Sequence, residues 1–194
     1  MPRFVRLILC VIAVLIVSTA LFAADTNVEY KVIATNKTST CQKEMNEASA
    51  AGFRFGGVMG GETSFGGSEV VTIMHRSAGD PKERFAYKLI ATNRTSTMQK
   101  ELQAAGDEGF EYKGQTVYQS TFGGKEVVVI LELDREKKDK AQWEYRLLAT
   151  SKTSTMQKEL AQAGVQGFEF VGVTVGETAM GGKEVVSILR RETK

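Results

Sequence analysis

One polar phrase occurs three times in the sequence and has the residue types of an anion site. It reads ATNKTSTCQKE from Ala34, ATNRTSTMQKE from Ala91 and ATSKTSTMQKE from Ala149. Each copy places a cation before a run of hydroxyls, and a helix beginning there adds free amides and the positive end of its dipole. We therefore predict a site for an anionic group or a glycan at three helix N-termini, formed by Lys37, Thr38, Ser39, Thr40, Arg94, Thr95, Ser96, Thr97, Lys152, Thr153, Ser154 and Thr155.

The same phrase also has a purely structural interpretation. In each copy a serine stands three residues before a glutamine, which is the spacing of a capping box, in which the hydroxyl and the amide satisfy the first backbone groups of a helix. Duplication of a capped helix would repeat the phrase without any ligand. The predicted caps are Ser39 with Gln42, Ser96 with Gln99, and Ser154 with Gln157.

The remaining residues do not form a recognisable catalytic set. The single histidine, His75, has Glu132 and Arg190 at the matching repeat positions, which indicates a solvated strand end. The sequence holds no His/Cys cluster with metal-ligand spacing, and we expect no metal or cofactor. Acids recur once on the helix and once near the turn of each repeat, so a hydrolase is the enzymatic alternative; these acids are Glu44, Glu101, Glu159, Glu69, Glu126 and Glu184.

The phrase belongs to a longer repeat that organises the chain. Tyr87 follows Tyr30 by 57 residues, and Tyr145 follows Tyr87 by 58 residues. Matching Gly-Gly pairs at Gly66, Gly123 and Gly181 keep the same spacing. The repeats cover residues 28–76, 85–134 and 143–191, separated by the charged or Gly/Pro-containing stretches SAGDPKER and REKKDKAQ, which are typical of linkers.

Within each repeat the pattern predicts a strand, a helix and two further strands. An alternating strand such as YKVIAT comes first, then the helix, an aromatic strand, a Gly-Gly hairpin and a strand such as VVTIM, which is apolar on nearly both faces. A strand of that kind suits the middle of a sheet. We predict an α+β protein of three tandem β-α-β-β repeats, each with a three-stranded antiparallel or mixed sheet, the third strand central, and one helix on one face.

The predicted helix carries a narrow apolar stripe and ends at a glycine. Residues at i, i+4 and i+7 share one helix face, and glycine takes the left-handed conformation that follows many helices. Cys41 replaces methionine on this stripe, which predicts a buried thiol. The stripe residues are Cys41, Met45, Ala48, Met98, Leu102, Ala105, Met156, Leu160 and Ala163, and the terminal glycines are Gly52, Gly109 and Gly167.

One repeat alone buries too little apolar surface for a stable fold, because it has about 50 residues and a single helix. Its last strand has apolar residues on both faces, as Val70 and Val71 illustrate. We therefore expect the repeats to pack sheet against sheet or to extend one another's sheets. Both a serial and a pseudo-threefold arrangement are consistent with the sequence.

The first 23 residues are typical of an export signal. Arg3 and Arg6 precede the apolar run from Leu7 to Val17, and small residues follow up to Ala23. An uncleaved membrane anchor is the alternative, and membrane contact is expected only in that case. Removal of residues 1–23 leaves 23 Lys and Arg (25 − 2) against 23 Asp and Glu. A neutral chain lacks the positive charge of a nucleic-acid-binding protein. We expect a periplasmic or extracellular location.

The openings EYKVIAT, the helix ends such as AAGFRFGGV and the closing apolar strands resemble the bacterial domain of unknown function 4177. That family has an E-Y-K-V opening and G-W-E-L-V after the helix. Phe53, Phe110 and Phe168 stand where the family pattern has tryptophan, and the hairpin is longer. The resemblance covers all three repeats. It implies a small β-α-β-β module and supplies no catalytic residues.

Together these observations favour a non-catalytic exported repeat protein. We expect it to act as a binding or scaffold module in the periplasm or cell envelope, with an unknown protein, a glycan or an anionic ligand as its partner. The alternatives are the hydrolase described above and a subunit of an envelope assembly that pairs through strand edges.

Overall fold

The computed structural model describes residues 27–63, 67–119, 124–137, 141–177 and 182–193, and the element order strand, helix, strand, strand occurs three times. We call the three groups unit 1, unit 2 and unit 3. Residues 1–23, the predicted signal, lie outside the described residues, as do Gly66, Gly123 and Gly181 of the predicted turns. Unit 1 comprises β1 (Val28–Thr35), α2 (Thr38–Ala50), β2 (Arg54–Thr63) and β3 (Gly67–Ser77); unit 2 comprises β4 (Phe85–Thr92), α3 (Thr95–Asp107), β5 (Glu111–Gln119) and β6 (Lys125–Asp134); unit 3 comprises β7 (Gln142–Thr150), α4 (Thr153–Val165), β8 (Glu169–Glu177) and β9 (Lys183–Thr193).

Each unit has its own antiparallel sheet with the third strand in the centre. The strand orders are β1-β3-β2, β4-β6-β5 and β7-β9-β8, so the predicted fold class and strand order are confirmed. The central strand β6 is buried on both faces from Val127 to Leu131, because units 1 and 3 cover it from opposite sides. In the described residues the sheets do not extend one another, so that part of the packing expectation is wrong.

The helices end as the sequence predicts but begin differently. Gly52 takes a φ of 93°, and the amide of Phe53 donates to the carbonyl of Ala48 at 3.1 Å, which closes the helix end as a Schellman motif. The predicted capping boxes are wrong. Each helix begins at the first threonine of its Thr-Ser-Thr run, its N-cap is the preceding cation, and no side chain caps it; the N-caps are Lys37, Arg94 and Lys152.

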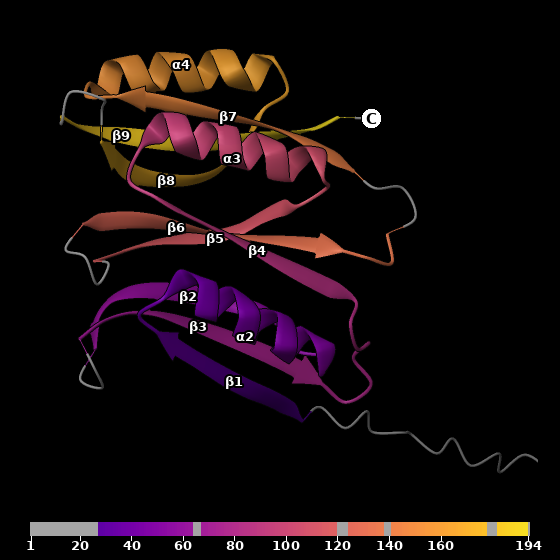
Figure 1. Ribbon diagram of the computed structural model, residues 1–194. Coiled ribbons are helices and arrows are strands. Elements are labelled where there is room, and N and C mark those ends of the chain that lie inside the picture. The colour runs from indigo at the N-terminus through magenta and orange to yellow at the C-terminus, as the bar shows by residue number, and fades with distance from the viewer. Residues whose placement is uncertain (1–26, 64–66, 120–123, 138–140, 178–181, 194) are drawn as a thin grey trace, which may run out of the picture.

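The units form a serial stack, in which α2 and α3 each lie between their own sheet and the next unit, while α4 lies at the end of the stack (Figure 1). Helix α2 packs on β1 and β3 and also on β4 of unit 2, while α3 packs in the same way on β7 of unit 3. The first core therefore joins Met45 and Met74 of unit 1 to Ile130 of unit 2. Each such boundary shares one hydrophobic core between two units, and we call the boundaries joint 1 and joint 2.

Sheets also touch directly beside the helices, as the packing prediction allowed. Strand β2 lies against β5, and β5 against β8. Gly60 makes the first contact possible, because a Cβ there would stand 2.7 Å from the carbonyl oxygen of Val117. The stack thus combines a helix layer on one side with direct sheet contact on the other.

The cysteine at the start of α2 is a buried core residue, as predicted. Cys41 has no exposed surface, and its Sγ lies 3.5 Å from Oγ1 of Thr72. Burial raises the pKa of the thiol, which disfavours the reactive thiolate. The residue packs as a small apolar side chain.

Candidate functional site

Polar side chains of α2 bind the edge of strand β4 at joint 1. Oε1 of Gln42 accepts a hydrogen bond from the amide of Leu89 at 2.8 Å. Oδ1 of Asn46 accepts from the amide of Tyr87 at 2.9 Å, and Nδ2 donates to the carbonyl of the same residue at 2.9 Å. Because β4 is an edge strand, these amides satisfy backbone groups that would otherwise be open to another chain.

Joint 2 repeats this arrangement one unit later. Oε1 of Gln99 accepts from the amide of Leu147 at 2.8 Å, and Oε1 of Gln103 accepts from the amide of Tyr145 at 3.0 Å. The glutamine of the repeated phrase therefore does not cap its own helix. In units 1 and 2 it binds the first strand of the following unit, which explains why the phrase carries a glutamine at that position.

At each joint a buried tyrosine hydroxyl forms a hydrogen bond to the backbone of the preceding unit. The hydroxyl of Tyr87 accepts a hydrogen bond from the amide of Phe55 at 2.8 Å and donates to Glu132 at 2.9 Å. The hydroxyl of Tyr145 accepts from the amide of Tyr112 at 2.7 Å and donates to the carbonyl of Phe110 at 3.0 Å. Burial raises the pKa of both tyrosines, so the hydroxyls stay protonated and keep donating.

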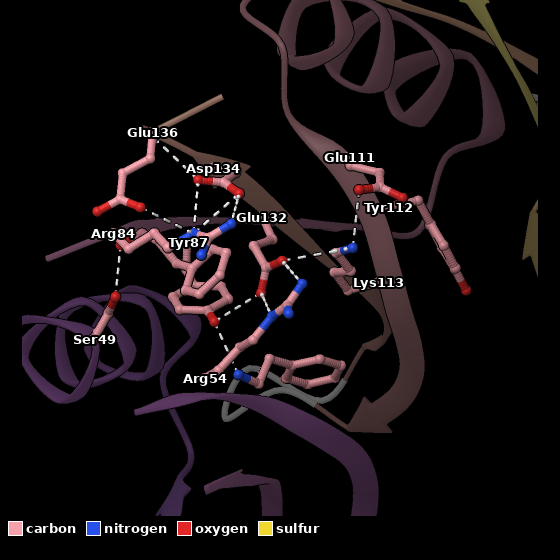
Figure 2. Close-up of polar contacts among 12 residues, drawn as sticks. Ser49, Arg54, Arg84, Tyr87, Glu111, Tyr112, Lys113, Glu132, Asp134 and Glu136 are labelled. Atoms are coloured by element: carbon pink, nitrogen blue, oxygen red, sulfur yellow. Dashed lines mark hydrogen bonds and ion pairs between the residues drawn. The ribbon is translucent and has the colours of Figure 1, made fainter. Parts of the chain in front are cut away.

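Charged side chains form a continuous row along the stack, which we call the charge ladder. Figure 2 shows Arg54 and Lys113 converging on Glu132 from two different units. Arg54 Nη2 lies 2.9 Å from Glu132, and Lys113 Nζ lies 3.5 Å from Glu132 and 2.9 Å from Glu111. The ladder continues through joint 2 with Arg190 2.7 Å from Glu111, and it ends with Glu169 3.3 Å from Arg190.

The charge ladder overturns the prediction of solvated strand ends. The side chains of Glu132 and Arg190 are only 3% and 16% exposed, and both are paired across a joint. The sign of the pair reverses from one joint to the next: Arg54 faces Glu132 at joint 1, whereas Glu111 faces Arg190 at joint 2. The residue types at Glu132 and Arg190 therefore match the opposing charges of the neighbouring units, which come from Arg54 and Glu111.

Acid should weaken joint 2 through Glu111. Burial acts to raise the pKa of this carboxyl, but Lys113 and Arg190 outweigh it and hold the pKa below its ordinary value of 4.5. A lowered folded-state pKa stabilises the fold above the ordinary value, and the stabilisation disappears as pH falls through the lowered pKa. We expect Glu111→Gln to unfold at lower urea than the wild type at neutral pH, with the gap narrowing below about pH 4.5. A gap that stays constant down to about pH 3 would contradict this assignment.

The two ends of the stack expose surfaces that are buried inside it. On the outer face of the unit 1 sheet, Tyr30 is 70% exposed, whereas its counterparts Tyr87 and Tyr145 are 3% and 2% exposed. We call this surface the lower face; its exposed apolar residues are Val28, Tyr30, Val32 and Met59. The upper face, beside α4 on sheet 3, exposes Phe170, Val173 and Val175.

The predicted anion-site residues are not brought together. The three helices all begin on the same side of the stack, but each lies in a different layer (Figure 1). Lys37, Arg94 and Lys152 are exposed. Thr95 donates a hydrogen bond to Glu184 of unit 3 at 2.8 Å, so a carboxylate of the protein itself already lies at the start of α3. A shared site for one multivalent anion therefore has no support from this arrangement.

Clefts lie between the described units. One of about 530 Å³ runs along β4 between α2 and α3 and includes Thr38, Ser39 and Glu101. Another, of about 390 Å³, is lined by Val117, Val127 and Val175 with two lysines. Within the part of the chain that the structure describes, no group of three or more His, Cys, Asp or Glu side chains is placed to hold a metal ion.

Neither a search for membrane-spanning helices nor comparison with known proteins identifies a further site. Among residues 27–193, apart from the gaps noted above, no helix is both long enough and apolar enough to cross a membrane. The sequence matches no family model, and neither a curated protein nor a solved structure matches it.

Proposed function

We propose that the chain is a non-catalytic exported scaffold or binding module whose working surfaces are the two end faces of the stack. The observation that carries this proposal is the exposure of Tyr30. This side chain is 70% exposed, although its repeat counterparts Tyr87 and Tyr145 are buried in joints 1 and 2. An exposed tyrosine among aliphatic side chains is typical of a protein-binding surface.

The edge of β1 adds backbone groups to the lower face. The edges of β4 and β7 are covered by glutamine and asparagine side chains of the preceding helix. Among the described residues, no preceding unit covers the corresponding edge of β1. An open strand edge beside an apolar sheet face suits a protein partner, because main-chain hydrogen bonds and side-chain burial act together.

A photo-reactive phenylalanine derivative at position 30, introduced in the cells that make the protein, tests this proposal. We expect illumination to link the chain to a second protein in the cell envelope or the medium. The matched control carries the same group at Lys43, which is 78% exposed on the outer side of α2 and should give no adduct. Equal yields at the two positions, or adducts confined to cytoplasmic proteins, would contradict the proposal.

A further inference from the structure

We propose that the partner of the lower face is a second copy of this chain, whose upper face binds there in the geometry of joints 1 and 2. This inference rests on the proposed function, because it names the occupant of the same surface. Inside the chain the same pair of surfaces meets twice, and the two faces left over at the ends are a third such pair. Joining them continues an interface that the molecule already forms.

The apolar parts of the two faces correspond position by position to the internal joints. Val28, Tyr30 and Val32 of unit 1 occupy the positions of Phe85, Tyr87 and Leu89, of which the first two belong to the first core and Leu89 packs against it. On the opposite side, Phe170 and Val173 of unit 3 occupy the positions of Phe55 and Val58, which pack against that core. Each face therefore presents the shape and chemistry that the other buries inside the stack.

The polar contacts of the joints have counterparts as well. Gln157 lies at the position of Gln42 and Gln99, and its side chain is exposed on α4. In the end-to-end complex it would accept a hydrogen bond from the amide of Val32 of the next copy. The hydroxyl of Tyr30 would accept from the amide of Phe170, as the hydroxyls of Tyr87 and Tyr145 do at the joints.

Charge distinguishes this pairing from a merely apolar contact. The charge ladder ends with Glu169 at the upper face, and the matching position of the lower face holds His75. A third joint would thus pair Glu169 with His75, after Arg54 with Glu132 and Glu111 with Arg190. In all three cases an acid faces a residue that can carry positive charge.

One residue makes the end-to-end contact weaker than the internal joints. Ala161 of α4 stands where Asn46 and Gln103 bind the backbone of Tyr87 and Tyr145. The end-to-end complex lacks those two hydrogen bonds and has no covalent linker. Because the two faces differ, the contact is head-to-tail and adds copies one after another rather than stopping at a symmetric dimer.

Sedimentation equilibrium over a range of protein concentrations tests the proposal, using both the full chain and the chain from Ala24 onward. We expect reversible association beyond the dimer. Glu169→Arg and His75→Glu should each weaken it about tenfold or more, and the double variant should recover it, because it recreates the Arg54–Glu132 polarity of joint 1. Urea unfolding of each variant separates lost association from lost folding.

A variant that associates more strongly than the wild type gives the most specific test of the proposed contact. Ala161→Gln should strengthen self-association about tenfold by restoring the amide that binds the edge strand, and Tyr30→Asp should abolish the gain. A wild-type chain and an Ala161→Gln variant that both stay monomeric at about 1 mM would overturn the proposal. If position 30 still forms adducts with another protein in that case, the proposed function stands and only its partner changes. If the chain from Ala24 onward associates but the full chain does not, the proposal still holds, and residues 1–23 compete with the second copy for the lower face.

Discussion

Replacement of Arg54 by glutamate is expected to lower the free energy of unfolding by about 3 kcal/mol or more. The partner, Glu132, is 3% exposed and accepts two hydrogen bonds from Arg54, at 2.9 and 3.4 Å. The substitution would place a second carboxylate against a buried one, and Lys113 at 3.5 Å would be the one remaining ion-pair partner within 4 Å among the described residues. An uncompensated buried charge is one of the few single changes with so large an effect.

The reciprocal change separates charge from packing. Adding Glu132→Arg to Arg54→Glu should restore roughly half of the loss, because the resulting polarity is that of Glu111 with Arg190 at joint 2, while Lys113 stays as an unfavourable neighbour. Urea unfolding followed by circular dichroism measures both variants. Lys43→Glu is the control, since its pair with Glu47 at 3.8 Å has side chains that are 78% and 59% exposed, and the change should alter stability by about 1 kcal/mol or less. Similar losses in Arg54→Glu and Lys43→Glu would disprove the buried joint.

Substitution of Gly106 by alanine is expected to destabilise the protein, although alanine favours helices. A Cβ at Gly106 would stand 2.2 Å from the carbonyl oxygen of Trp143 and 2.9 Å from the ring of Tyr145. Backbone cannot swing aside as a side chain can, so α3 and β7 would have to separate. Overpacking of this kind costs about 1 to 3 kcal/mol and outweighs the gain in helix propensity of about 1 kcal/mol.

Gly164 provides the control at the same position of the next helix. A Cβ there meets no atom within 4 Å, so Gly164→Ala should stabilise the protein by about 1 kcal/mol. The two substitutions are chemically identical and should have opposite signs. Measurement at low protein concentration keeps the end faces free. Stabilisation by both would show that α3 does not sit against β7 as described.

Features that depend on neighbouring residues could be predicted from the sequence. The apolar central strand, the helix stripe and the glycines that end the helices are all local patterns, and each leads to the observed element. The strand order followed from the two-sided burial of segments such as Val127 to Leu131. Packing of one unit on the next was only partly predictable, because strand alternation shows that a face is buried but not what buries it.

The errors arose where a residue acts on another unit. Gln42 has the spacing of a local cap, but its amide binds Leu89, which lies 47 residues away. Glu132 looks like a solvated strand end until its partner is known. The sequence does contain one signal of this contact. The first residue of the second strand changes from Arg54 in unit 1 to Glu111 in unit 2, and the residue opposite it in the following unit changes from Glu132 to Arg190. Opposite changes at two repeat positions indicate contact between successive units.

The reversal of charge between joints also bears on how such a gene can shorten. Its repeated phrases are places where the coding sequence can recombine with itself and lose one repeat. A deletion between the first and second phrases keeps Glu111 opposite Arg190. A deletion between the second and third phrases leaves Arg54 opposite Arg190, so two cations would share one joint. Only the deletion between the first and second phrases leaves opposite charges at the remaining joint. Two-repeat proteins that descend from this chain should therefore more often carry that deletion than the one between the second and third phrases.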